Sequence, residues 1–298
     1  MSKESFDRKL AEVEALRSIP ESEALPKLKK ALKDRNNYVA AKAARIASEC
    51  SWRALIPELV EAFERFLRDP VRSDSQCWAK NAIVKALKDL GFTDATLYIR
   101  GTKHFQMEPV WGGRVDTAAT LRAASAHALV ICPIDSFTVL THLTDLLADA
   151  APPVRIEAAR AIARLSAREG ALPLRLKALS GDAEPEVIGH CLISLLNLDT
   201  RDHLDFVASF LENDNPDLRI ESAAALVESR EPRALEILKN FWDKQADPLV
   251  KRALLNLFAS SPLPESAIFL ESVVESASPQ ISAWAREALN QSRHGKAE

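Results

Sequence analysis

The sequence predicts an all-α fold, a right-handed α-α superhelix (alpha solenoid) of about eight stacked helix pairs, and two observations lead to this prediction. Five segments in the second half each carry an apolar anchor residue, and successive anchors lie 33, 31, 32 and 31 residues apart. A fixed period of roughly 20 to 50 residues is typical of a solenoid. Composition agrees, because the 298 residues include only 8 glycines and 2 tyrosines and show no strand alternation bounded by hairpin signals. The anchors are Val154, Val187, Leu218, Val250 and Ile281.

Each repeat predicts an antiparallel helix pair. A proline stands two residues before every anchor, where a helix can begin because the missing N–H of proline would be unpaired there anyway. Small or apolar residues follow four and eight residues after the anchor, as on one stripe of a helix. Shorter apolar runs between these helices, such as ALPLRLKAL and ALEILKNFW, are long enough for one more helix each. The prolines are Pro152, Pro185, Pro216, Pro248 and Pro279.

The first half follows the same register less regularly. Going back from Val154, the anchors are Leu121, Trp78 and Val39, and the last two steps lengthen to 43 and 39 residues. We predict a capping helix in residues 1–20, because the terminal units of a solenoid need a polar outer face. We predict a single repeat array in residues 21–298, with an insertion loop at 101–116.

The repeats resemble a known family. The resemblance to HEAT repeats, in particular the short kind also found in phycobilisome lyases, extends from about residue 24 onward and is strongest in residues 149–290. HEAT arrays serve mainly as scaffolds, adaptors and transport factors, and a few are enzymes, so the resemblance implies a fold more specifically than a function. It rests on the stretch DNPDLRIESAAALVESREPRALEIL and on Pro153, Val154 and Arg155 followed by Ala158 and Ala159.

Two polar rows flank the anchors. An acid or amide stands five residues before an anchor and a base one residue after it, which suggests a catalytic constellation at first sight. The spacing favours a structural ladder instead, because HEAT families use this pair to tie the turns of successive repeats together, and aspartate can also cap the following helix. Ile188 interrupts the basic row, which indicates weaker coupling or a local contact site. The rows are Asp34, Asp116, Asp149, Asp182 and Asn213, and Arg122, Arg155, Arg219 and Lys251.

The insertion GTKHFQMEPVWGGRVD at residues 101–116 is the clearest departure from the period. Long loops in compact arrays are usually functional or disordered, and aromatic residues and methionine argue against disorder. Two interpretations stay open: the loop folds back over apolar surface at one end of the array, or it presents its side chains to a partner. The candidate partner-binding residues are His104, Phe105, Met107, Trp111 and Arg114.

A second candidate surface follows the second helices of the pairs. In HEAT arrays these helices line the concave surface, so the row three residues after the anchors is a candidate binding strip. A solvated helix face is the other interpretation of each member. The candidates are Glu157, His190, Glu221 and Trp284.

Charge and motifs disfavour several classes. A net charge of −3 does not provide the basic stripe that duplex DNA binding needs, so a nucleic-acid partner is not expected. Neither of the glycine-rich nucleotide-binding motifs, G-x-x-x-x-G-K-[ST] and G-x-G-x-x-G, occurs in the sequence, and the six histidines lack metal-ligand spacing. We therefore predict no catalytic, cofactor-binding or metal-binding residues. No apolar run approaches the roughly 20 residues that span a bilayer, and the first residues lack a signal-peptide core. We expect a cytoplasmic protein with no membrane partner.

These observations favour a non-enzymatic protein-binding scaffold or adaptor that uses the concave face and the aromatic loop. The alternative is an enzyme resembling the HEAT-like alkylpurine DNA glycosylases or the phycobilin lyases. A glycosylase would need a basic concave face, and the resemblance to the lyases rests on the repeat type alone. Four dispersed cysteines are predicted to be reduced core thiols. They are Cys50, Cys77, Cys132 and Cys191.

Overall fold

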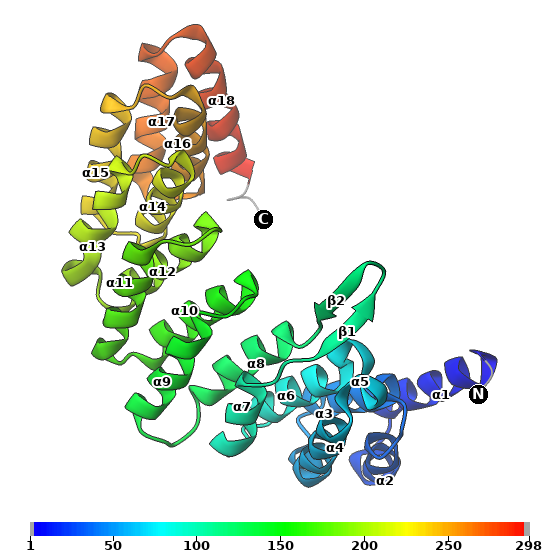
Figure 1. Cartoon of the computed structure of the whole chain (residues 1–298). Coiled ribbons are helices and arrows are strands. Elements are labelled where there is room, and N and C mark those ends of the chain that lie inside the picture. Colours follow the sequence, from blue (N-terminus) through cyan, green and yellow to red (C-terminus); the bar gives the residue numbers. More distant parts are fainter. Residues whose placement is uncertain (1–2, 295–298) are drawn as a thin grey trace. The chain divides into compact units, whose positions relative to one another are not determined.

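The computed structural model describes residues 3–294, which form an all-α protein with one small β-hairpin (Figure 1). The described chain runs through eight successive helix pairs, as the period predicts. The first four pairs are α2 (Glu21–Leu32) with α3 (Asn37–Glu49), α4 (Ile56–Arg68) with α6 (Trp78–Asp89), α7 (Ala95–Thr102) with α8 (Ala119–Leu129), and α9 (Ser136–Leu146) with α10 (Pro152–Leu165). The last four are α11 (Ala171–Ser180) with α12 (Pro185–Leu198), α13 (Thr200–Ser209) with α14 (Pro216–Glu228), α15 (Pro232–Lys244) with α16 (Pro248–Ser260), and α17 (Pro264–Ser276) with α18 (Pro279–His294).

The chain divides into two compact units, Met1–Ala161 and Ile162–Glu298, and the division falls inside α10. In the first unit, α1 (Lys3–Glu14) packs on α3, α3 on α6, and α6 on α8, while the first helices of these pairs pack against that layer. In the second unit, α12, α14, α16 and α18 pack side by side, and α11, α13, α15 and α17 lie against them (Figure 1). The single array predicted for residues 21–298 stays a prediction.

The second helices begin where the prolines indicate. Each of the five prolines is the first residue of its helix, from α10 to α18. The residues four positions after the anchors are all fully buried, and at four of the five positions a small side chain lets neighbouring helices approach. These residues are Ala158, Cys191, Ser222, Leu254 and Ala285.

One predicted anchor is wrong by one residue. Trp78, the first residue of α6, is 47% exposed, whereas Ala79 is fully buried. With Ala79 as the anchor, Asp74 stands five residues before it and Lys80 one residue after it, so this repeat also has its acid and base. A small buried residue suits the close packing of α3 on α6, and the indole of Trp78 therefore faces outward.

The insertion contains ordered strands. β1 (Met107–Val110) pairs antiparallel with β2 (Gly113–Asp116), and the pair of residues Trp111 and Gly112 forms the turn. Gly112 has φ +86°, a left-handed conformation that favours glycine. The expectation of a chain without hairpin signals was wrong here, because strands of four residues are too short to show an alternating pattern.

No described helix has the length and apolar character needed to span a bilayer. The four cysteines are free thiols, as predicted, and all but the half-buried Cys50 are buried. Burial raises the pKa of the Cys77 and Cys191 thiols to about 12 and that of Cys132 to about 11. These three thiols are therefore protonated and unreactive at neutral pH.

Candidate functional site

The base of the hairpin is fixed by a buried carboxylate. Glu108 on β1 is 5% exposed and points into the turn that precedes α6. Its Oε1 accepts hydrogen bonds from the amide of Gln76 (2.7 Å), from Gln106 Nε2 (2.6 Å) and from Thr117 Oγ1 (2.7 Å). Its Oε2 accepts a longer bond from Ser75 Oγ (3.2 Å). A buried carboxylate needs such partners, so these bonds hold the hairpin against a turn about thirty residues earlier in the chain.

A second buried pair supports that turn. Asp74 and Lys80 are both fully buried, and Lys80 Nζ lies 2.9 Å from Asp74 Oδ2. The Asp74 carboxylate also accepts the amides of Ala79 (2.8 Å) and Lys80 (3.0 Å) at the start of α6. The side-chain amide of Gln106 donates to the backbone carbonyl of Asp74 (2.7 Å). The turn before α6 and the strand before the hairpin therefore share one hydrogen-bond network.

The second strand is fixed by Arg122 of α8, which is fully buried. Its guanidinium makes a two-point contact with Asp149 (2.7 and 2.9 Å) and an ion pair with Asp116 at the end of β2 (2.6 Å). It also donates to the carbonyl of His104 (3.0 Å) and lies 4.0 Å from the ring centre of Phe105. One side chain thus joins both ends of the insertion to the turn before α10.

Two carboxylates of this network, Asp116 and Glu108, are held in their charged form. Burial raises the pKa of Asp116, but hydrogen bonds from the amides of Gln106 and Ala118 and from Arg122 outweigh burial, so the pKa lies below its usual value. For Glu108, hydrogen bonds from Thr117 and Gln106 likewise outweigh burial and lower the pKa.

The outer part of the hairpin is apolar and exposed. Trp111 at the tip is fully exposed, and Val110, Val115 and Met107 are 47%, 43% and 40% exposed. The indole of Trp111 therefore covers no apolar surface of the described chain. The result is an apolar surface, here called the hairpin tip, on a base that is held by charged hydrogen bonds.

The predicted loop residues divide into two groups. Met107 and Trp111 belong to the exposed hairpin tip. His104, Phe105 and Arg114 make structural contacts: the first two with Arg122, and Arg114 with the carbonyl of Met107 (2.9 Å). Sequence analysis missed Gln106 and Glu108, because an acid and an amide in a loop give no signal of burial.

One pair of the acid and base rows joins successive repeats as a ladder would, Arg122 with Asp149. In five repeats the acid or amide accepts the backbone amide two residues later at 2.9 to 3.0 Å, which closes a turn before the helix and does not cap the helix itself. Arg155 donates to the carbonyl of Asp149 (2.7 Å), and Arg219 lies 3.6 Å from Asp247 of the next repeat.

The second-helix row, Glu157, His190, Glu221 and Trp284, lies on four helices of the two units. In the first unit, Glu157 lies 2.5 Å from His127 Nε2 and accepts a hydrogen bond from Arg160 (2.6 Å). Burial raises the pKa of Glu157, but hydrogen bonding to His127 and the charge of Arg160 outweigh burial and lower the pKa. This carboxylate already has partners within the chain, which makes it a weaker candidate for binding.

In the second unit, Glu221 packs directly over Gly189 of α12, where an added Cβ would lie 1.9 Å from its Oε2. Burial and the neighbouring carboxylates of Glu186 and Asp217 raise its pKa. His190 lies 3.8 Å from Glu186. The ring of Trp284 is 5.5 Å from the guanidinium carbon of Arg252. Glu221 is therefore the member of the row whose charge is least compensated.

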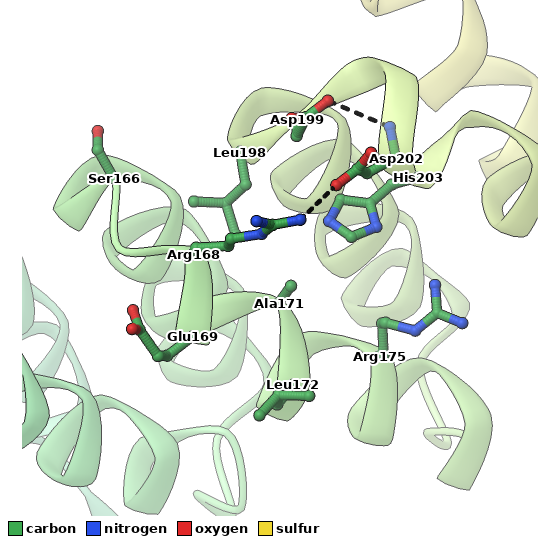
Figure 2. Close-up of a pocket in the computed structure, with 10 residues that line it drawn as sticks. All are labelled: Ser166, Arg168, Glu169, Ala171, Leu172, Arg175, Leu198, Asp199, Asp202 and His203. Carbon is green, nitrogen blue, oxygen red and sulfur yellow. Dashed lines mark hydrogen bonds and ion pairs between the residues drawn. The ribbon is translucent and has the colours of Figure 1, made fainter.

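A cavity of about 850 Å³ lies in the second unit between the start of α11 and the turn from α12 to α13 (Figure 2). Arg168 points across it and pairs with Asp202 (3.0 Å), and Asp199 caps α13 by accepting the amide of Asp202 (3.1 Å). Burial and the charge of Arg175 lower the pKa of His203, whose Nδ1 is buried without a hydrogen-bond partner. The cavity is polar on this side, and Leu172 and Leu198 line the rest.

Within residues 3–294, no group of three or more histidine, cysteine, aspartate or glutamate side chains is placed to hold a metal ion. Residues 172–259, from α11 to α16, match the family model described as HEAT repeats. This segment is therefore similar to HEAT repeats. The resemblance read from the sequence is confirmed over this HEAT segment, whose pairs have the proline openings and buried small residues described above.

No curated protein matches the chain. Among solved structures, Escherichia coli YibA is 16% identical, with 97% of each chain covered and a TM-score of 0.49. An engineered protein is 17% identical over 94% of this chain and 83% of its own, with a TM-score of 0.39. Human deoxyhypusine hydroxylase is 16% identical over 95% of this chain and 88% of its own, with a TM-score of 0.30. Similarities of this size carry no information on function.

Replacing Arg122 with methionine should destabilise the protein strongly. The change leaves the buried Asp149 without its counter-ion and the Asp116 carboxylate without its ion pair, which costs about 3–5 kcal/mol. Urea denaturation of both proteins measures the difference. The matched control is Arg219→Met at the same ladder position, where the contacts are 3.5 and 3.6 Å long and the side chain is partly exposed. An equal loss in both variants would contradict the special role of Arg122.

Acid should weaken the hairpin base. The folded-state pKa values of Glu108 and Asp116 lie below their unfolded values, which are about 4.3 and about 3.9. Both carboxylates therefore stabilise the fold at pH values above the unfolded pKa. This contribution is lost as the pH falls through the folded-state pKa values. Urea denaturation should show a free energy of unfolding that falls as the pH is lowered below about 4. The fall should be smaller in Glu108→Gln, which has no carboxylate to protonate. The same fall in that variant would show that Glu108 does not contribute.

Proposed function

We propose that the chain is a non-enzymatic protein-binding module that acts in the cytoplasm and recognises its partner with the hairpin tip. The observation that carries the proposal is Trp111, which is fully exposed at the end of a hairpin whose base is held by buried hydrogen bonds. Large aromatic side chains dominate the binding energy of many protein interfaces. A rigid support reduces the ordering entropy that binding costs.

The surroundings of Trp111 support this proposal. Met107, Val110 and Val115 add apolar area next to the indole, and Arg114 adds a cation, which together resemble the composition of interface centres. The extended second-helix row remains a second candidate surface, with Glu221 as its least compensated charge. None of the described contacts favours the glycosylase or the phycobilin-lyase alternative.

Changing Trp111 to serine should abolish partner binding and leave the fold intact. An exposed side chain contributes little to stability, so the free energy of unfolding should change by less than about 0.5 kcal/mol. Affinity capture from native lysate, read by mass spectrometry, should lose the partners that the unchanged protein retains. The matched control is Phe137→Ser on α9, another exposed aromatic side chain, which should retain them.

Point variants are preferable to removal of the insertion. A deletion that includes Gln106 and Glu108 would take away buried partners of the turn before α6, so lost capture could reflect lost folding. Partners that persist in Trp111→Ser but disappear in Glu221→Lys would contradict the proposal and assign binding to the second-helix row.

A further inference from the structure

The hairpin, which projects from the helices of the first unit (Figure 1), has unpaired backbone groups along its outer edges. The amide of Thr117 donates to the carbonyl of Gln106 (2.9 Å), so these two residues form a hydrogen-bonded pair that continues the ladder. Along antiparallel strands such pairs alternate with non-bonded pairs, in which the N–H and C=O groups point away from the neighbouring strand. Two pairs of the register are therefore non-bonded. They are Met107 with Asp116, and Pro109 with Arg114.

The two outer edges of the hairpin differ. On β1, Pro109 has no N–H to offer an added strand, and the carbonyl of Met107 already accepts a hydrogen bond from Arg114 Nη2 (2.9 Å). Proline on an edge strand protects it against pairing with another chain. On β2, the outward groups belong to Arg114 and Asp116, and within residues 3–294 no hydrogen bond from another element reaches these backbone groups. β2 is therefore an open edge, and β1 is a protected one.

An open edge is matched by another strand, because a strand repeats donors and acceptors at the same interval. A third strand that complements β2 in the antiparallel sense has to read base, apolar residue, acid from its amino end. This is the order of Arg114, Val115 and Asp116, so β2 of a second copy complements β2 itself. A two-fold interface requires self-complementarity of this kind.

Geometry selects one register for this self-pairing. Outward residues have to lie opposite outward residues, which leaves registers centred on Arg114, on Val115 or on Asp116. The first places Arg114 opposite itself and its second pair in the turn at Gly112, and the third places Asp116 opposite itself and its second pair just before α8. Only the register centred on Val115 keeps both pairs within the strands, and each of them joins Arg114 of one copy to Asp116 of the other.

The side chains agree with this register. Val115, which is 43% exposed, would meet Val115 of the other copy at the axis. Arg114 is exposed, so it can exchange its bond to the carbonyl of Met107 for the carboxylate of Asp116 of the other copy. Asp116 keeps its ion pair with Arg122 and has a side chain that is 20% exposed. The opposite charges therefore select the register, while the main-chain hydrogen bonds supply the pairing.

We propose that two copies of the chain pair through their β2 edges, about a two-fold axis at Val115. The result is one antiparallel sheet with the strand order β1, β2, β2, β1, and both of its outer edges are the protected β1. Association therefore stops at two copies. This pairing uses the main-chain edge of β2 and not the indole of Trp111, so it is independent of the proposed function. The two are read by different measurements, the mass of the purified chain and the capture of another protein.

Analytical ultracentrifugation of the full chain tests the pairing. From about 1 to about 300 μM, the average mass should rise from the chain mass of 32.8 kDa towards twice that value and no further. Arg114→Pro removes the outward N–H and none of the bonded pairs of the hairpin, so it should raise the Kd of the dimer at least about tenfold. Arg114→Glu, which places like charges opposite each other, should also weaken the dimer. The matched control Arg114→Lys keeps both the N–H and the charge and should dimerise like the unchanged chain.

Amide hydrogen exchange, followed by NMR, locates the contact. The amides of Arg114 and Asp116 should become protected only at concentrations where the dimer forms, whereas the amide of Val115, which is bonded within the hairpin, should be protected at every concentration. A thermal melt of each variant checks that the fold is retained. A mass that stays at one chain up to the highest concentration, a mass that continues to rise beyond two chains, or a dimer that persists unchanged in Arg114→Pro would overturn the proposal.

Discussion

The structure of the first unit depends on a buried cation, Arg122, which has to satisfy its charge away from water. Burial of a guanidinium is tolerated only when carboxylates and carbonyls surround it, and here Asp149, Asp116 and the carbonyl of His104 do so. These partners come from the turn before α10 and from the two ends of the insertion. The contacts that satisfy the charge of Arg122 therefore also order the hairpin of the insertion.

The consequence for function is that the insertion is ordered at its base and exposed at its tip. Glu108 ties β1 to the turn before α6, Arg122 of α8 holds the end of β2, and the two-residue turn places Trp111 in solvent. Charged hydrogen bonds supply the order that an apolar core would otherwise provide, so the apolar side chains remain available for a partner.

Periodicity predicted the helices well, because a proline at a helix start and a small residue four positions after the anchor each reflect a local steric need. Sequence could not predict the burial of Glu108, since its partner Gln76 lies about thirty residues away and only the fold brings them together. The exposed leucines of α11 were missed for another reason: the run ALPLRLKAL reads as a core helix, although Leu172 and Leu176 share a face that the repeat does not bury.

Amide hydrogen exchange of residues 106–117 in the free protein tests the central claim most directly. If buried charges hold the hairpin before any partner binds, the cross-strand amides of β1 and β2 should exchange much more slowly than those of an unstructured peptide, and Arg122→Met should remove this protection. Exchange at the rate of an unstructured peptide in the unchanged protein would contradict the claim, because the hairpin would then become ordered only on binding.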